Sequence, residues 1–173
     1  PLFDWIPALD QVPRDLERGD EVTIFDLPGG RLGSVISFEG AFARSTRPQV
    51  KAGAELLVVA TNKASFGDTP VSDQFIGMTR MRAAELGTDV VHAAITGRSA
   101  FIAADGSIDL KSEPFISEVM LGTVHFRSAG PTMYTRMGDW LQYVAVAVGS
   151  VVVAAAWLNR RRELAAAEAP EDN

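Results

Sequence analysis

Residues 52–67, which read AGAELLVVATNKASFG, contain the stretch that decides the fold. Within them, residues 55–61 (ELLVVAT) form a short and almost unbroken apolar run. A run of this length without alternation is typical of a strand that is covered on both faces, as in a parallel sheet. The sequence therefore predicts a buried strand at this position.

The segment after this strand is predicted to be a helix that ends at about Leu86. Thr69 is a candidate N-cap, and Pro70 suits the first helical turn. Apolar residues recur at helical spacing through the segment. Gly87 then follows, as expected for a helix that ends in a left-handed conformation.

Further runs on both sides predict the rest of the sheet. Residues 21–27 and 31–37 flank Pro28-Gly29-Gly30, which indicates a β-hairpin. A helix is expected over residues 41–52, beginning late or kinked because of Pro48. Strands are predicted over residues 90–95, 99–104, 107–110 and 120–126, with a turn at Asp105-Gly106. This alternation indicates an α/β domain, with a mixed or parallel sheet and helices outside it.

The composition excludes several classes of function. The net charge of −6 is unlike the excess of basic residues that nucleic-acid binding requires, so no nucleic-acid partner is expected. The chain has no cysteine, which excludes disulfides, thiolate-bound metals and a thiol nucleophile within these residues. With only two histidines, a histidine-rich metal site is not expected either. We therefore predict neither a metal nor a cofactor.

The carboxyl-terminal part predicts a transmembrane helix. Residues 141–158 (LQYVAVAVGSVVVAAAWL) carry no charge and match the thickness of a bilayer core. Trp140 and Trp157 lie near the two ends, and three arginines follow at 160–162. The alternative is a buried core helix. The predicted division is a domain over 1–138 outside the cytoplasm, a span over 139–158 in the cell membrane, and a cytoplasmic tail over 159–173.

Four blocks of the sequence resemble the carbon–nitrogen hydrolase (nitrilase) superfamily. They are GSVISFE at 33–39, AGAELLVVATNKASFG at 52–67, QFIGMTRMRAAELG at 74–87 and TGRSAFIAADG at 96–106. In order and spacing they are similar to the carboxyl-terminal half of the apolipoprotein N-acyltransferases. Because the chain also opens on Pro1 rather than Met, it is expected to be part of a longer polypeptide.

The resemblance implies a fold and an activity. The fold would be the carboxyl-terminal half of a nitrilase-like α-β-β-α sandwich, followed by one transmembrane helix and completed by strands from an amino-terminal half. The activity would be transfer of an acyl chain from a phospholipid to the N-terminal diacylglyceryl-cysteine of a lipoprotein. The implied partners are therefore the phospholipid donor, the lipoprotein acceptor, the membrane and the missing half of the domain.

The resemblance also implies positions for the active site. The nucleophile would lie at Ser37, where the family has cysteine, and the N–H of Phe38 would bind the oxyanion. Glu39 matches an active-site glutamate, and this role is favoured over the alternative of a solvated turn residue. The family's catalytic Glu and Lys lie upstream of this segment, so Lys63 and Glu21 are not assigned to those roles.

The other residues singled out in the sequence fit either a role in the site or a structural role. Asn62, Phe66 and Gly67 match a block that lines the pocket in the family, but Asn and Gly also form ordinary turns. Arg82 and Glu85, three residues apart, are predicted to form a structural ion pair on one helix face. His92 and His125 are predicted to be core histidines with satisfied hydrogen bonds.

Three hypotheses for function follow. The first is the membrane acyltransferase with Ser37 in place of the usual cysteine. The second is a catalytically inactive relative that binds lipid or lipoprotein, or that supports a partner enzyme, because a hydroxyl is far less acidic than a thiol. The third is a soluble amidase or nitrilase domain, against which the predicted span and its arginines argue.

Overall fold

A computed structural model describes residue 19 and residues 21–127 and 130–167. The expectations for residues 1–18 and 168–173 lie outside the described residues. The described part forms one six-stranded sheet in the order β1-β2-β3-β4-β5-β6. The strands are β1 Ile24–Leu27, β2 Gly30–Ile36, β3 Leu56–Thr61, β4 Asp89–Ala94, β5 Ala100–Ile102 and β6 Ile108–Lys111. The helices are α1 Ala43–Lys51, α2 Val71–Leu86, α3 Met133–Met137 and α4 Trp140–Ala167, with 3₁₀ turns η2 Ser37–Ala41 and η3 Ala64–Phe66.

The centre of the sheet is parallel and its edges are antiparallel. Strands β2, β3 and β4 run parallel, with Val35 opposite Val59 and Val59 opposite His92. The β1–β2 hairpin and the β4–β5 and β5–β6 pairs are antiparallel. The mixed α/β sheet predicted from the sequence is therefore confirmed. Because β2, β3 and β4 share a direction, the loops that follow them meet at one edge of the sheet, and these loops carry the candidate site.

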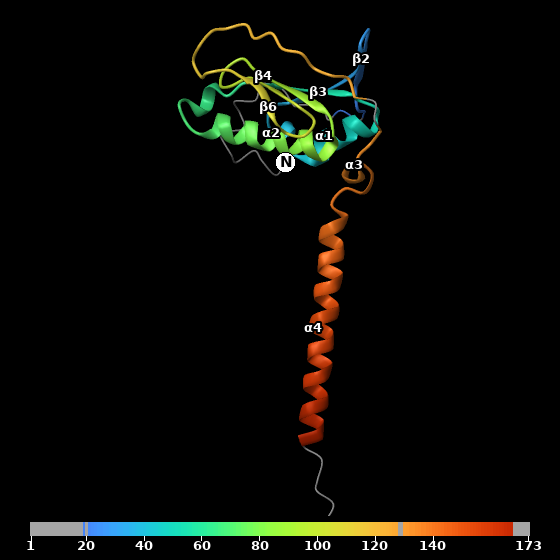
Figure 1. Ribbon diagram of the computed structural model, residues 1–173. Coiled ribbons are helices and arrows are strands. Elements are labelled where there is room, and N and C mark those ends of the chain that lie inside the picture. Colours follow the sequence, from blue (N-terminus) through green and yellow to red (C-terminus); the bar gives the residue numbers. More distant parts are fainter. Residues whose placement is uncertain (1–18, 20, 128–129, 168–173) are drawn as a thin grey trace, which may run out of the picture.

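Helices α1 and α2 cover one face of the sheet (Figure 1). The core beneath them contains Leu57 and Val59 of β3, Ile76 and Leu86 of α2, and Val90 of β4, all 2% exposed or less. On the other face, Ile36 is 68% exposed and Ile95, just after β4, is 86% exposed. The described residues thus supply one helical layer and one sheet, with apolar side chains left open on the second face.

Two predictions about the helices need comment. Gly87 ends α2 at φ 64°, as predicted. The predicted N-cap at Thr69 is wrong, because the helix begins at Val71 and Pro70 occupies the cap position. The Thr69 hydroxyl instead donates to the carbonyl of Phe66, 2.8 Å away, and so stabilises the preceding 3₁₀ turn.

The predicted strand over residues 120–126 is also wrong. This segment pairs with no strand of the described sheet, and the buried side chain of Asp89 holds it instead. Asp89, at the start of β4, accepts hydrogen bonds from His125 N (2.9 Å), His125 Nδ1 (3.1 Å) and Arg127 Nε (3.0 Å). The prediction that His125 is a core histidine is wrong as well, because its side chain is 67% exposed.

Hydrogen bonds with α1 and α2 hold the segment that leads to α4. Arg47 donates from Nε to the carbonyl of Thr135 and from Nη2 to that of Arg136, each at 2.9 Å. Thr132 caps α3 by accepting from Thr135 N, and its hydroxyl donates to the carbonyl of Glu85. These contacts fix α3 beneath the helical layer.

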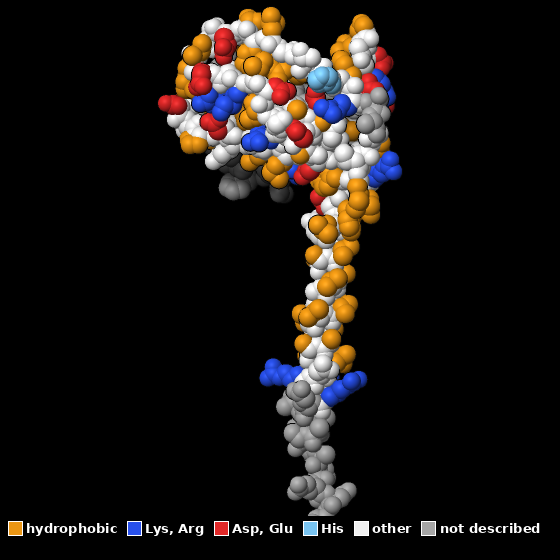
Figure 2. Space-filling model, viewed as in Figure 1, with side chains coloured by type: hydrophobic (Ala, Val, Ile, Leu, Met, Phe, Trp, Pro, Cys, Tyr) orange, Lys and Arg blue, Asp and Glu red, His pale blue; other side chains and the backbone are white. Residues whose placement is uncertain are grey.

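Helix α4 extends away from the domain (Figure 1), and Figure 2 shows apolar side chains on it as far as its arginines. By length and composition, one helix could cross a membrane, at Trp140–Arg162, and none of its apolar window is buried among the described residues. The alternative of a buried core helix is therefore not what the structure shows. The helix continues to Ala167, beyond the boundary at residue 158 expected from the sequence.

Candidate functional site

Ser37 lies at the sharp turn between β2 and the 3₁₀ turn η2. Its φ is 50°, and Phe115 is the one other non-glycine residue of the described chain with a positive φ. A β-carbon makes this left-handed region unfavourable, and such strain collects at active sites. A strand-to-helix turn of this kind exposes the side chain at its apex, which is where an enzyme places a nucleophile.

Two polar side chains approach the Ser37 hydroxyl. The Thr61 hydroxyl, at the end of β3, donates to Ser37 Oγ at 3.4 Å. Lys63 Nζ lies 3.5 Å from the same oxygen. The adjacent parallel strands β2 and β3 thus bring Ser37, Thr61 and Lys63 together at the sheet edge. Lys63, which was not predicted to belong to the site, is thus one of its residues.

Lys63 is buried beneath aromatic rings. It is 4% exposed, and its Nζ lies 3.1 Å from the centroid of the Phe75 ring and 5.9 Å from that of Phe66. Burial lowers the pKa of Lys63 from its ordinary value, because the charged form loses its hydration. Among the described residues, no carboxylate lies within ion-pair distance of it.

The loop after β3 is organised by its own hydrogen bonds. Lys63 N donates to the carbonyl (3.2 Å) and the hydroxyl (3.0 Å) of Thr96, while Asn62 Oδ1 accepts from Ala64 N (3.0 Å) and from the Thr96 hydroxyl. Gly67 has φ 54° and ends the 3₁₀ turn. Of the predicted pocket residues in this loop, Asn62 and Gly67 shape the backbone, and Phe66 supplies a half-exposed ring next to Lys63.

Phe38 and Glu39 follow Ser37 in η2. The ring of Phe38 packs edge-on against Phe75 at 5.1 Å. The first N–H groups of a helical turn have no acceptor within it, so the Phe38 N–H is suited to hold an oxyanion beside Ser37. The carboxylate of Glu39 accepts from Ile36 N at 2.8 Å, which closes the turn.

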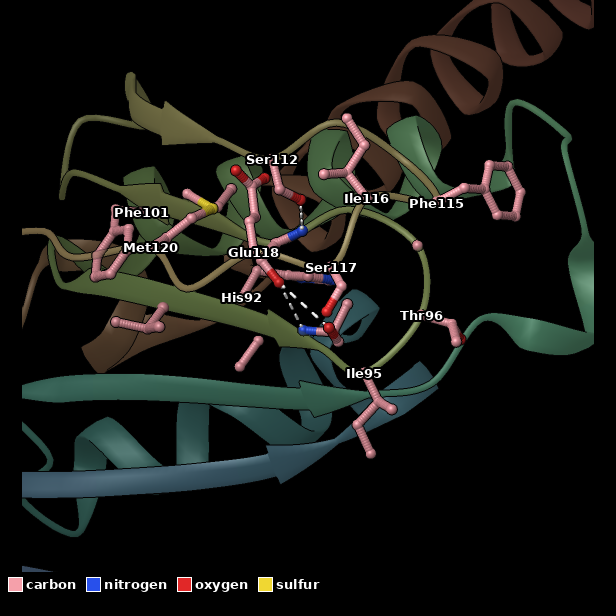
Figure 3. A pocket seen from close by; sticks show the side chains of 16 residues that line it. His92, Ile95, Thr96, Phe101, Ser112, Phe115, Ile116, Ser117, Glu118 and Met120 are labelled. Atoms are coloured by element: carbon pink, nitrogen blue, oxygen red, sulfur yellow. Dashed lines mark hydrogen bonds between the residues drawn. The ribbon is translucent and has the colours of Figure 1, made fainter.

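The open face of the sheet beside Ser37 contains an apolar hollow of about 600 Å³. It is lined by Ile36, Ser37, Ala60, Thr61, Asn62, Ala93, Ala94, Ile95 and Ser99. A second hollow of about 440 Å³ adjoins it and shares the β4 residues Ala93 and Ala94. Figure 3 shows this second hollow with Phe101 and Met120 at one end and Phe115 at the other. None of the predicted site residues lines it.

The remaining predicted residues lie away from the Ser37 hydroxyl. Arg82 Nη2 and Glu85 Oε1 form an ion pair at 2.9 Å on α2. Burial raises the pKa of Glu85, with Asp139 adding to that effect and Arg82 opposing it. Neither residue lines a hollow described above. Their position beside the segment leading to α4 favours the structural role.

His92 is a core histidine, as predicted. It is 1% exposed, and its Nδ1 lies 3.0 Å from the hydroxyl of Thr79. That hydroxyl donates to the carbonyl of Phe75, so its oxygen accepts the proton of Nδ1. Burial, aided by the charge of Lys63, lowers the pKa of His92 to about 4, and the ring is therefore neutral.

The described residues contain no group of His, Cys, Asp and Glu side chains arranged to hold a metal ion. The described residues bring together a hydroxyl, a buried amine and backbone N–H donors at this edge of the sheet.

The chain is similar in sequence to a known family and to full-length proteins of bacteria. Residues 4–134 match the family described as carbon-nitrogen hydrolase. The apolipoprotein N-acyltransferase of Geobacter metallireducens is 36% identical over 173 residues, which cover 95% of this chain and 33% of that protein. That of Ralstonia nicotianae is 33% identical over 95% of this chain and 32% of its own length. The chain thus spans about a third of the length of these relatives.

Solved structures give weaker similarity. A variant of the Nesterenkonia AN1 amidase from the nitrilase superfamily has a TM-score of 0.48 at 20% identity, covering 57% of this chain and 40% of that one. A carbon-nitrogen hydrolase from Helicobacter pylori has a TM-score of 0.49 at 13% identity, covering 56% and 41%.

Proposed function

This chain belongs to the carbon–nitrogen hydrolase family, and from that premise we propose that it is part of a membrane N-acyltransferase. The reaction is transfer of an acyl chain from a phospholipid to the N-terminal diacylglyceryl-cysteine of a lipoprotein. The names of the relatives support this proposal, since those of Geobacter metallireducens and Haemophilus ducreyi are both apolipoprotein N-acyltransferases.

The observation that carries the proposal is the position of Ser37. It lies at the carboxyl end of a parallel strand, at a strained φ of 50°, and its hydroxyl lies within reach of a basic group. In the proposed reaction Ser37 Oγ bonds to the carbonyl carbon of the phospholipid ester, and the lysophospholipid alkoxide leaves with a proton. The acceptor amine then attacks the acyl-serine, an amide forms, and the Ser37 hydroxyl is restored. Phe38 N–H holds the oxyanion in both steps.

The membrane location rests on α4. Its apolar window is exposed and is followed by arginines at 160–162. We assign this end to the cytoplasm and the sheet domain to the opposite side of the cell membrane, following the positive-inside rule. An exposed helix of this kind also argues against a soluble amidase or nitrilase domain.

The open sheet face supports the expectation of a second half-domain. Ile36 and Ile95 are largely exposed there, beside an apolar hollow. A surface of this kind needs a cover in a soluble domain. We propose that the amino-terminal half of the same domain packs on this face with its own sheet and completes the α-β-β-α sandwich.

A second candidate function is an inactive relative with a binding or scaffolding role. The presence of serine instead of cysteine favours it, because a hydroxyl is a poor nucleophile unless a base activates it. Glu39 offers no such activation, since its carboxylate is engaged by Ile36 N.

One experiment separates the two functions. The full-length protein that contains this chain is reconstituted with a phospholipid labelled in its acyl chain and a diacylglyceryl-cysteine peptide. We expect the wild type to acylate the peptide and Ser37→Ala to lose this activity. If wild type and Ser37→Cys both fail to transfer the label, the acyltransferase proposal is wrong. If only Ser37→Cys transfers it, the serine inactivates the enzyme.

A further inference from the structure

Lys63 differs from the other lysines of the chain in its surroundings. Lys51 and Lys111 are exposed, whereas Lys63 is 4% exposed and its amine is enclosed by the rings of Phe75 and Phe66. No carboxylate of the described residues pairs with this amine, and a buried amine without such a partner is costly to keep charged. Its one side-chain hydrogen-bond partner among the described residues is the hydroxyl of Ser37, at 3.5 Å.

The loop backbone holds Lys63 in this position. Lys63 N donates twice to Thr96, and a β-carbon at Gly97 would lie 3.1 Å from Lys63 Cβ. The strand before it is fixed by pairing on both sides, with Thr61 opposite Ala94 and Ala60 opposite Ile36. The paired strands β2 and β3 therefore fix the positions of the Ser37 hydroxyl and the Lys63 amine relative to each other.

The charged and titratable groups around Lys63 leave its amine unpaired among the described residues. On β4, His92 is buried and neutral. On α2, Asp73 is held by Arg98 Nε at 3.2 Å and Lys111 Nζ at 3.3 Å. On η2, Glu39 accepts from Ile36 N. Burial, which no carboxylate among the described residues opposes, lowers the pKa of Lys63 and so shifts the amine toward the form that can accept a proton.

The hydrogen bonds at Ser37 Oγ are both received by the oxygen, and they leave the proton of the hydroxyl available for transfer. The Thr61 hydroxyl donates to Ser37 Oγ, which leaves the proton of Ser37 free to point elsewhere. Lys63 Nζ also donates to this oxygen, at 3.5 Å. In its neutral form the same nitrogen carries a lone pair and lies within reach of the Ser37 proton, and such contacts tighten when substrate binds. The Thr61 hydroxyl can thus stabilise the alkoxide that develops on Ser37 Oγ, while the Lys63 amine accepts the Ser37 proton.

We propose that Lys63 is the general base that activates Ser37, so that the site works as a serine–lysine dyad contained within this chain. The Ser37 proton moves to Nζ as Oγ bonds to the acyl carbonyl carbon, and the Lys63 ammonium returns it to the departing alkoxide. In the second step Nζ takes a proton from the attacking amine and returns it to Ser37 Oγ. This inference rests on the proposed function for its substrates, but the dyad itself does not depend on them.

A hydroxyl nucleophile needs such a base more than a thiol does. The free thiol of cysteine has a pKa of about 8.5, so part of it is ionised near neutral pH, whereas a serine hydroxyl is not. Serine–lysine pairs are a recurrent solution to this requirement on unrelated folds.

The test measures the reactivity of Ser37 apart from acyl transfer. The full-length protein in detergent is treated with a fluorophosphonate, which forms a bond from Ser37 Oγ to phosphorus and releases fluoride. We expect the labelling rate to rise with pH, with a midpoint below the value of about 10.4 of an ordinary lysine. Lys63→Met and Lys63→Arg should each lower the rate by about 100-fold or more and remove that rise. Lys51→Arg, an exposed lysine on α1, is the matched control and should label as the wild type does.

A second variant pair keeps the result interpretable if Lys63 also supports the fold. Ser37→Cys alone and Ser37→Cys combined with Lys63→Met are treated with iodoacetamide. We expect both to alkylate at position 37, because a thiol ionises without Lys63. Fluorophosphonate labelling lost in Lys63→Met, together with alkylation kept in the double variant, supports the dyad.

Other outcomes overturn the proposal. Lys63→Arg with the wild-type rate and pH profile would show that a fixed charge suffices and that no base acts there. Absence of labelling in the wild type at every pH would show that Ser37 is not activated. Labelling that depends on Lys63 without any acyl transfer would support the dyad and refute the acyltransferase function.

Discussion

The backbone strain at Ser37 can be measured by removing its β-carbon. At φ 50°, a residue with a β-carbon costs roughly 1–2 kcal/mol more than glycine. Glycine in turn loses about 0.5–1 kcal/mol more conformational entropy on folding. Ser37→Ala and Ser37→Gly both remove the hydroxyl, so their difference isolates the backbone term. We expect Ser37→Gly to be more stable than Ser37→Ala by about 0.5–1 kcal/mol.

Thermal unfolding of the full-length variants in detergent, followed by fluorescence, measures this difference. The expected gain for glycine over alanine at position 37 is a rise of about 1–3 °C in Tm. The matched control is Ala84→Gly on the exposed side of α2, where the same change should lower stability by about 1 kcal/mol. A Ser37→Gly variant that melts at or below the temperature of Ser37→Ala would refute the idea that this turn is strained.

Asp89→Asn should lower the free energy of unfolding by about 2 kcal/mol, because the buried carboxylate accepts from Ala104, His125 and Arg127. Burial alone would raise the pKa of Asp89, but the hydrogen bonds from His125 and Arg127 lower it. The stabilisation from the Asp89 carboxylate is therefore present above about pH 4 and is lost as the pH falls through the folded-state pKa. The difference in Tm between Asp89→Asn and the wild type should become smaller in that range, and a constant difference would contradict this. Residues 21–138 expressed alone should aggregate through the open sheet face, and Ile95→Lys should raise their soluble fraction; a soluble, monomeric wild-type fragment in gel filtration would contradict this. A fluorescent protein fused after residue 173 should fluoresce in the cytoplasm, whereas activity of an alkaline phosphatase fusion at the same point would show the opposite orientation.

The sheet was predictable because its central strands are continuous apolar runs and its hairpin has a typical turn sequence. The apolar run at 55–61 indicates β3, and the Pro-Gly-Gly turn indicates the hairpin of β1 and β2. The segment over 120–126 has a similar apolar content but forms no strand. Its conformation depends on the buried carboxylate of Asp89, more than thirty residues earlier, and no local pattern reveals such a partner.

The candidate site was predictable in part. Ser37 and its turn follow from the resemblance in block 33–39, whereas Lys63 was not assigned a catalytic role because the catalytic lysine of the family lies upstream of this segment. A signal was nevertheless present. Residues that directly follow adjacent parallel strands lie at the same edge of the sheet, and Lys63 follows the strand next to the one that ends before Ser37. The replacement of cysteine by serine also called for a base in this neighbourhood.

The measurement that tests the central claim most directly is capture of the acyl-enzyme. The full-length protein is incubated with phospholipid in the absence of acceptor, and the peptide that contains Ser37 is analysed by mass spectrometry. We predict an acyl chain on Ser37 that resists neutral hydroxylamine, as an oxygen ester does, and that leaves when the acceptor peptide is added. An acyl group on another residue, or acyl transfer that proceeds equally well in Ser37→Ala, would contradict the account.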